Sequence, residues 1–193
     1  TVYRVNTGFV PETQQTRMGK LDWNSVLNAQ AESEERNRLI VNIVQAYADR
    51  NFLILCKRVA HAKRLVEMLG EIGEDVTSLV GIQKYFNTES RILVATVQKA
   101  GVGFDHPKLD TLLVAADLQE YFIQYLGRVF RTEDSEPIIF DLVDDFRVLL
   151  QHYRTRRRVY LKHGGVVKTF AIPSDWVSTL IPKISKPNLK SFF

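Results

Sequence analysis

The chain has 193 residues, of which 45% are hydrophobic and 25% are charged. This balance is typical of a globular protein and excludes a disordered or fibrous chain, and the length suits one well-buried domain with extensions. No apolar run reaches the roughly 20 residues that a membrane span needs, and residues 1–20 lack a signal-peptide pattern. We therefore expect an intracellular fragment of a longer protein, located in the cytoplasm or nucleus, with no membrane partner.

Charge and cysteine content narrow the possible partners. Lys and Arg number 26 against 22 Asp and Glu, so the net charge of +4 permits a polyanionic partner without requiring one. Cys56 is the only cysteine, which excludes an internal disulfide and a cysteine-rich zinc site. The four histidines show no H-x-x-x-H spacing, so we expect no metal site.

In chain order, residues 1–32 read as an extended lead-in followed by a short helix. Asp22 is a predicted cap for a helix that begins at Trp23. Ser33 is a predicted cap for a longer helix, whose apolar positions recur at helical spacing and should pack on a sheet. These positions are Leu39, Ile40, Ile43, Val44 and Tyr47.

Short apolar runs and helical segments then alternate. A helix is predicted from Val59 to Leu69, and strands are predicted at 52–56, 76–80, 92–95, 111–115 and 137–142. Their hydrophobicity is continuous rather than alternating, as strands covered by helices on both faces require. The predicted class is α/β with a mostly parallel sheet.

The last part of the chain carries a basic helix and a tail. Phe146, Leu149, Leu150, Tyr153 and Tyr160 mark one apolar face of the helix, which should end at Gly164 and Gly165. The cluster Arg154 to Arg158 should form its solvated face, with nucleic-acid contact as a secondary hypothesis. A final edge strand is predicted at 166–172, so the main domain should span 33–172 and an irregular basic tail 173–193.

The segment from Gln124 to Arg131 carries the clearest chemical signal. In a helix, Gln124, Arg128 and Arg131 would share one polar stripe at i, i+4 and i+7. Two guanidiniums one turn apart suit a phosphate, because arginine is permanently charged and has a planar fork of donors. For an arbitrary pair, solvated surface arginines would be the better interpretation.

A second signal follows the predicted strand at 92–95. Thr96 places a hydroxyl at the carboxyl end of that strand, Gly101 and Gly103 allow close backbone approach, and Asp105 offers a carboxylate for a ribose hydroxyl. A G-x-G-x-D pattern alone is weak, since most such stretches are turns.

Together and in this order, the two segments resemble motifs V and VI of superfamily 2 helicases, and 124–131 matches the pattern Q-x-x-G-R-x-x-R. Residues 52–58 resemble motif IV, so the resemblance covers roughly 33–162. The runs at 35–37, 103–107 and 141–145 are most similar to XPB-like, phage and large-DNA-virus helicases, such as those of poxviruses or African swine fever virus. The resemblance implies a C-terminal RecA-like domain and, for a viral source, the host cytoplasm or the virion.

The resemblance also implies roles for individual residues. Arg128 and Arg131 would be arginine fingers that reach an ATP, with its Mg²⁺, bound mainly by an N-terminal RecA-like lobe. Gln124 would orient them or touch the nucleotide, and Gly103 and Asp105 would face the ribose. A further set would contact a DNA or RNA backbone, single-stranded or duplex, independently of sequence: Lys57, Arg58, Gly81, Thr96, Gln98 and Lys99.

One missing motif limits what this chain can do alone. ATP hydrolysis needs a phosphate cradle G-x-x-x-x-G-K-[ST] and an acidic metal-binding motif. The sequence contains neither, and the Gly19-Lys20 pair lacks the upstream glycine and the hydroxyl. We therefore expect half of a bipartite site, inactive without its partner lobe.

Other interpretations compete with the motor. The chain could be a non-catalytic module that docks nucleic acid or protein, whereas a dehydrogenase or methyltransferase would need a glycine-rich turn that 56–60 lacks. Asp141, Asp144 and Asp145 could form a nuclease metal cluster, but capping of the next helix by Asp144 or Asp145 is the favoured explanation. His61 is expected at the surface and Cys56 in the core.

Overall fold

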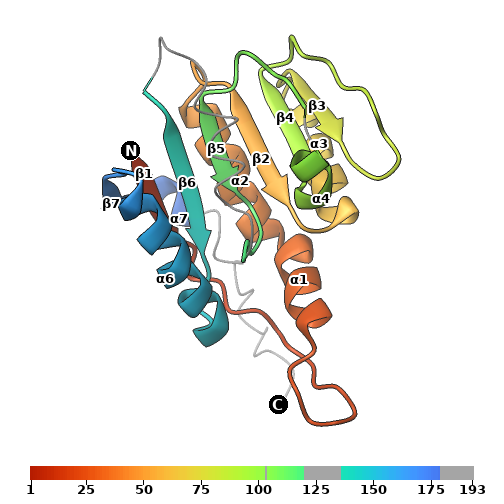
Figure 1. Ribbon diagram of the computed structural model, residues 1–193, viewed down its shortest axis with the longest axis vertical. Helices are drawn as coiled ribbons and strands as arrows, with labels where there is room; N and C mark the ends of the chain where they lie inside the picture. The colour runs from red at the N-terminus through yellow and green to blue at the C-terminus, as the bar shows by residue number, and fades with distance from the viewer. Residues whose placement is uncertain (103, 120–135, 179–193) are drawn as a thin grey trace, which may run out of the picture.

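The computed structural model describes residues 1–102, 104–119 and 136–178, which form a seven-stranded parallel sheet in the order β3-β4-β2-β5-β6-β1-β7 (Figure 1). The strands are β1 (Val2–Asn6), β2 (Phe52–Cys56), β3 (Val76–Leu79), β4 (Ile92–Thr96), β5 (Thr111–Val114), β6 (Ile138–Val143) and β7 (Val167–Thr169). The helices are α1 (Trp23–Glu32), α2 (Glu34–Ala46), α3 (Val59–Glu71), α4 (Val97–Val102), α6 (Arg147–Lys162) and α7 (Ser174–Ser178). The predicted α/β class and parallel sheet are confirmed.

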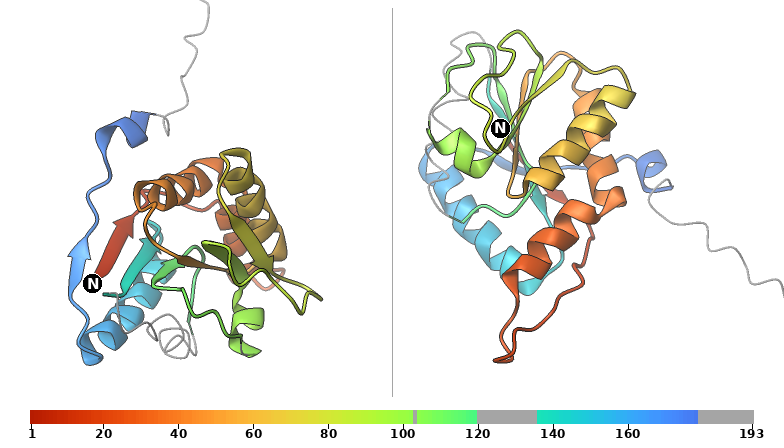
Figure 2. Two further views of the ribbon diagram at one scale, coloured as in Figure 1. Left: turned by 90° about the horizontal axis from the view of Figure 1, so that it is seen from above. Right: turned by 90° about the vertical axis from the view of Figure 1, so that its right-hand side faces the viewer.

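Helices cover both faces of the sheet, which explains the continuous apolar runs (Figure 2). On β2, Phe52, Ile54 and Cys56 join one buried cluster with α2 and α3. Leu53 and Leu55, which point the other way, join a second cluster with α4 and α6. Because a strand alternates its side chains between two faces, a strand buried on both must be apolar throughout. The placement of Cys56 in the core is confirmed, since it is fully buried.

The two predicted helix caps are present. The Asp22 side chain accepts a hydrogen bond from Asn24 N at 3.0 Å, and the Ser33 hydroxyl accepts one from Arg36 N at 3.2 Å. Each satisfies a backbone donor that the first helical turn leaves unpaired. The helix predicted after Ser33 is α2, and its apolar face lies in the core beneath the sheet.

Strand β1 was not predicted from the sequence. It lies inside the sheet, where Val2 pairs with Ile139 of β6 and with Val167 of β7. The N-terminal lead-in therefore contributes a structural strand to the domain. Strand β7 lies at the sheet edge as expected, but the tail begins with the short helix α7 rather than with irregular chain. Within the described ranges, no helix is long and apolar enough to cross a bilayer.

His61 is buried, contrary to the surface position expected for it. It is 1% exposed on α3, and its Nε2 donates to Asn37 Oδ1 of α2 at 2.8 Å. Burial, with the Arg36 charge adding to it, lowers the pKa of His61 to about 3. The ring is therefore a neutral link between two core helices.

This burial predicts a specific acid sensitivity. In the unfolded chain His61 takes up a proton below its ordinary pKa of 6.5, whereas the folded protein does not until about pH 3. The His61 contribution to stability is thus complete above pH 6.5 and is lost as the pH falls, approaching about 1.4 kcal/mol per pH unit. His61→Gln should lose less stability than the wild type between pH 7 and pH 4 in urea unfolding. Parallel pH curves for the two proteins would contradict this.

Candidate functional site

The predicted nucleic-acid contacts follow neighbouring strands at one edge of the sheet. Cys56 pairs with Thr96, and Leu79 pairs with Ala95, so β2, β3 and β4 end side by side. Lys57 and Arg58 follow β2, and Gly81 follows β3 after one residue. The parallel fold thus brings the two basic side chains and the backbone at Gly81 to the carboxyl ends of the strands, where α/β proteins bind ligands.

The two basic residues after β2 are placed differently. Lys57 is exposed, whereas Arg58 is half-buried and its Nη2 donates to Asn24 Oδ1 of α1 at 2.6 Å. Arg58 is also the first residue outside α3, which has no side-chain cap. Lys57 therefore offers an exposed surface charge, and Arg58 joins the end of β2 to α1.

Of the three predicted nucleic-acid contacts at and after the end of β4, one is buried and two are accessible. Thr96 is 4% exposed, so little of the predicted backbone contact is accessible from its side chain. Gln98 is exposed in α4, and Lys99 Nζ donates to the carbonyl of Gln83 at 2.8 Å. Lys99 therefore binds the loop that precedes β4. Gly81, in that loop, has a φ of +57°, a conformation that favours glycine.

The predicted nucleotide contacts are only partly described. Asp105 is exposed in the loop after α4. Gly103, Gln124, Arg128 and Arg131 lie outside the described residues, so the structure does not place them. Residues 115–118 precede the segment that resembles motif VI. They are buried directly after β5, at the same carboxyl end of the sheet as Thr96 and Lys57.

A buried charged network, missed in the sequence, underlies this edge. Arg36 of α2, 2% exposed, has its Nε 2.9 Å from Asp144 Oδ1 and also donates to the carbonyl of Ala115. Gln30 of α1 donates to Asp144 Oδ2 at 2.7 Å. Asp144 therefore does not cap α6 as predicted, and α6 begins without a side-chain cap. The network fixes α1 and α2 to the ends of β5 and β6.

Comparison with known proteins gives named relatives, although no family model matches the sequence. The chain is 41% identical over 191 residues to putative helicase 161L of Invertebrate iridescent virus 6, and 38% identical over 151 residues to putative helicase 055L of Frog virus 3. These matches cover 89% and 78% of this chain and 43% and 34% of the relatives. DNA 3'-5' translocase XPB2 of Sulfurisphaera tokodaii is 23% identical over 67% of the chain and 31% of its own length.

Solved structures agree on the fold. T4 UvsW matches 88% of this chain and 41% of its own with a TM-score of 0.65 and 18% identity. The E. coli DEAD-box protein SrmB matches 96% of this chain and 95% of its own with a TM-score of 0.56 and 18% identity. The chain therefore has the RecA-like α/β fold of these solved helicase domains, and it is related in sequence to the two putative viral helicases. It spans well under half the length of the helicases and the translocase that it matches in sequence.

In this helicase-type domain, a second buried network corrects two predictions. Arg156, in the cluster expected to be solvated, is 4% exposed and binds both carboxylate oxygens of Asp141 at 2.8 and 2.9 Å. It also donates to Asp117 at 3.1 Å, and Tyr160 donates to Asp141 at 2.7 Å. Burial opposes the charge of Arg156, but the carboxylates outweigh it and raise its pKa. Asp141 and Asp144, each held by an arginine, cannot form the nuclease cluster considered from the sequence.

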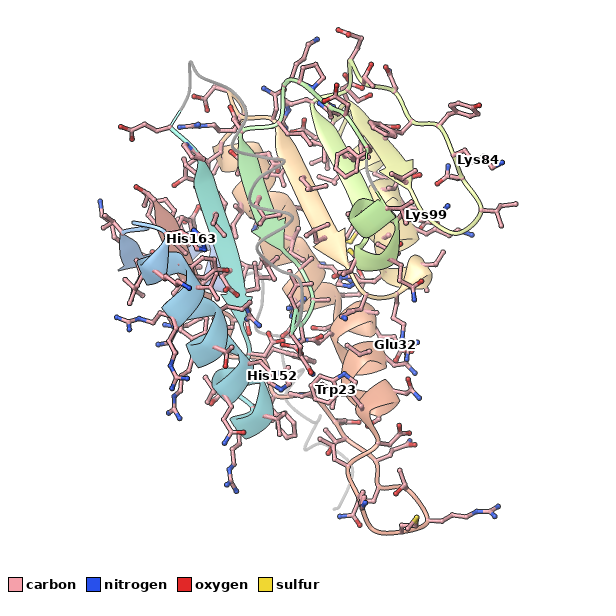
Figure 3. All side chains as sticks on the ribbon, in the orientation of Figure 1. Trp23, Glu32, Lys84, Lys99, His152 and His163 are labelled. Atoms are coloured by element: carbon pink, nitrogen blue, oxygen red, sulfur yellow. The ribbon has the colours of Figure 1, made fainter. Side chains whose placement is uncertain are left out.

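The second network reaches the surface of the domain at His152. Its Nδ1 lies 2.8 Å from Asp117 Oδ2, and its ring meets that of Trp23 of α1 edge-on, with centroids 5.5 Å apart (Figure 3). The carboxylate of Asp117 thus lies between His152 and Arg156. Helices α1 and α6, far apart in sequence, meet here beside the point where β5 ends.

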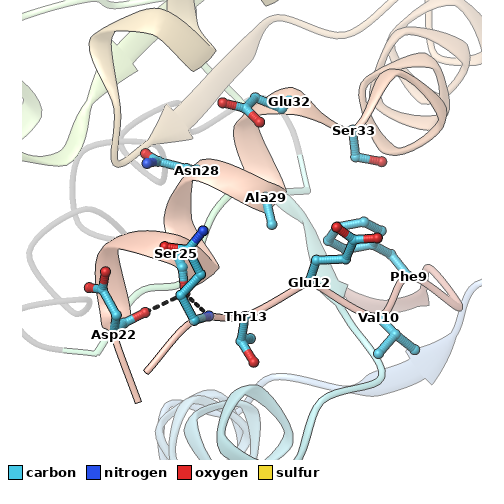
Figure 4. Close-up of a pocket in the computed structure, with 11 residues that line it drawn as sticks. Phe9, Val10, Glu12, Thr13, Asp22, Ser25, Asn28, Ala29, Glu32 and Ser33 are labelled. Carbon is cyan, nitrogen blue, oxygen red and sulfur yellow. Dashed lines mark hydrogen bonds between the residues drawn. The ribbon is translucent and has the colours of Figure 1, made fainter. Parts of the chain in front are cut away.

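A wide groove of about 760 Å³ in the domain lies between the segment 9–14 and α1 (Figure 4). Among the described residues, its lining includes Glu12, Asp22 and Glu32 and no lysine or arginine. Three carboxylates without a cation repel phosphate groups, so this groove is unsuited to nucleic acid or to a nucleotide. The basic strand ends at 57–58 are the better candidate for a phosphate contact.

Proposed function

We propose that the chain is the C-terminal motor lobe of an ATP-dependent helicase or translocase that acts on DNA or RNA. It contacts the nucleic-acid backbone and supplies arginine fingers to an ATP held, with Mg²⁺, mainly by an N-terminal RecA-like lobe, without which it is inactive. The observation that carries this proposal is the convergence of the segments resembling motifs IV and V at one sheet edge. Because the three relatives named above that are called helicases or a translocase include two viral proteins, we also infer a viral source.

The described residues fit a nucleotide that is bound mostly elsewhere. Asp105 is exposed, and within the described ranges its carboxylate has no hydrogen bond or ion pair, so it is available to a ribose hydroxyl. Arg128 and Arg131 would supply the cations that offset charge on the γ-phosphate. Bound ATP would then join the two lobes, and hydrolysis would separate them, moving the protein along one strand.

The nucleic-acid contact is proposed to be electrostatic and independent of sequence. Lys57 and Lys99 follow the neighbouring strands β2 and β4, and the exposed Gly81 follows the next strand, β3, on the far side of β4. Such a surface recognises phosphates rather than bases. Its affinity falls as the salt concentration rises, because the release of counterions from the nucleic acid then gains less free energy. Gln98, exposed beside Lys99, adds a neutral donor.

Salt-dependent binding tests this proposal. The wild-type chain should bind a labelled oligo(dT) strand weakly, with an affinity that falls steeply between two salt concentrations. Lys57→Ala should weaken binding and lower the slope of log K against log salt by about 1, since one phosphate contact is lost. Fluorescence anisotropy measures both quantities.

Lys162→Ala is the matched control. Lys162 is the exposed last residue of α6, and its neighbour His163 lines a pocket with Thr1 and Pro137, which precede β1 and β6, so α6 ends at the amino ends of the strands. Its removal should leave the slope unchanged. A wild-type chain that does not bind the strand, or equal slopes in Lys57→Ala and Lys162→Ala, would contradict the proposed contact surface.

A further inference from the structure

The loop between β3 and β4 presents two large apolar side chains to solvent beside the proposed phosphate contacts. Ile82 is 97% exposed and Tyr85 is 88% exposed. Ile82 follows Gly81 directly, and Gln83 and Lys84 separate it from Tyr85. Singly exposed apolar side chains are ordinary on a protein surface, so it is their place beside the proposed phosphate contacts that makes these two candidates for contact with the strand.

The loop is fixed on both sides of Tyr85. Before it, the Gln83 side-chain oxygen accepts hydrogen bonds from Val80 N at 3.0 Å and from the Ser78 hydroxyl at 3.2 Å, and the Gln83 carbonyl accepts one from Lys99. After it, the ring of Phe86 meets Phe104 edge-on, with centroids 5.6 Å apart. The ring of Tyr85 is thus presented by anchored neighbours, so little conformational entropy is lost when it is covered.

The surroundings of Tyr85 are basic. Lys84 precedes it, and Lys99 is bonded to the same loop, so both cations lie on this side of the molecule (Figure 3). The acidic member of the loop, Glu89, forms an ion pair with Lys108 and its charge is balanced. An exposed aromatic ring on a loop that also carries cations is the combination by which proteins hold single strands, with bases stacked on the ring and phosphates near the cations.

A nucleic-acid base suits this loop better than a protein surface does. A protein-docking patch is contiguous and apolar over several hundred Å². Here Gln83 and Lys84 separate Ile82 from Tyr85, so the apolar groups are two isolated points. Single bases, spaced along a charged backbone, match that pattern.

We propose that Tyr85, supported by Ile82, stacks on a base of the single strand that the domain holds, with Lys84 on an adjacent phosphate. This inference rests on the proposed function and adds a base-contacting element to it. The loop therefore discriminates strands that carry bases from strands that carry phosphates alone, with no preference for base identity, since every base has a π-face.

Two strands of about 12 nucleotides test the inference, one of oligo(dT) and one of abasic spacers with the same phosphates. The wild-type chain should prefer oligo(dT). Tyr85→Ala should weaken oligo(dT) binding about 5- to 100-fold and leave the abasic strand unchanged. Tyr85→Phe should bind as the wild type does. Met18→Ala is the matched control, since Met18 is 82% exposed in the turn before α1.

The outcomes separate the two proposals. Binding of neither strand by the wild-type chain would overturn the proposed function, and the stacking role with it. Binding of both strands with equal affinity, or an equal loss for both in Tyr85→Ala, would overturn the stacking role while leaving the phosphate contact intact. A loss in Met18→Ala as large as that in Tyr85→Ala would also overturn it, because the effect would not be specific to this loop.

Discussion

Replacement of Arg131 by alanine should lower nucleic-acid-stimulated ATP hydrolysis by about 10³- to 10⁵-fold in a protein that joins this chain to an ATP-binding N-terminal lobe. The guanidinium would offset charge that develops on the transferred phosphoryl group, so its loss raises the barrier rather than the Kd of ATP. Arg128→Ala should have a similar effect. Steady-state ATPase rates at saturating strand and ATP measure the loss.

Strand binding and a surface arginine provide the controls for the finger role. Arg131→Ala should bind oligo(dT) as the wild type does, because the phosphate contacts at Lys57 lie on another segment. Arg158→Ala, which removes an exposed arginine of α6, should hydrolyse ATP at the wild-type rate. Turnover that is unchanged in both Arg128→Ala and Arg131→Ala would refute the finger role and favour the non-catalytic docking module.

The second large effect concerns stability. Arg156→Met should lower the free energy of unfolding by about 3–5 kcal/mol, because it leaves the buried carboxylates of Asp141 and Asp117 without their cation. Methionine fills most of the volume of the arginine, so the lost free energy of unfolding reflects the missing charge rather than a cavity. Urea unfolding followed by circular dichroism gives the free energy.

A second substitution separates charge from packing. Adding Asp141→Asn to Arg156→Met should recover part of the loss, since the amide is neutral and still accepts from Tyr160. Arg157→Met, at an exposed neighbour, should change stability by no more than about 0.5 kcal/mol. A cost below about 1 kcal/mol for Arg156→Met would show that the network is not a source of stability.

Local sequence pattern was sufficient for most of the fold. Strands β2, β4 and β5 were predicted because their continuous apolar runs leave few alternatives in a sheet covered on both faces. Strand β1 was missed for a physical reason. Its sequence mixes Val2 and Val5 with Arg4 and Asn6, and its partners lie more than 130 residues away, so no local period reveals it.

The buried polar residues were harder to predict, although a signal existed. His61 lies on the stripe of Leu65 and Leu69 at i, i+4 and i+8, and Arg156 lies between Tyr153 and Tyr160 on the buried face of α6. Their spacing along the helix predicted buried positions, whereas their polar or charged side chains predicted exposed ones. The chemistry misled because partners on other elements, Asn37 and Asp141, satisfy these groups.

The candidate site was predictable where a motif follows a strand. Lys57, Gly81 and Thr96 could be placed at one edge because parallel strands end together. The burial of Thr96 and the hydrogen bond from Lys99 to Gln83 could not be predicted, because both depend on how α4 packs. The roles of Gln124, Arg128 and Arg131 stay predictions.

The position of β1 between β6 and β7 has a consequence for how the chain is made. The ribosome synthesises β1 before either of its neighbours, which do not exist until Ile138 and then Val167 have been added. At ordinary elongation rates the interval is roughly 7 to 30 s. During that time the nascent β1 has neither of its partner strands, so the half of the sheet formed by β2 to β5 can assemble first, and β1 joins the sheet last.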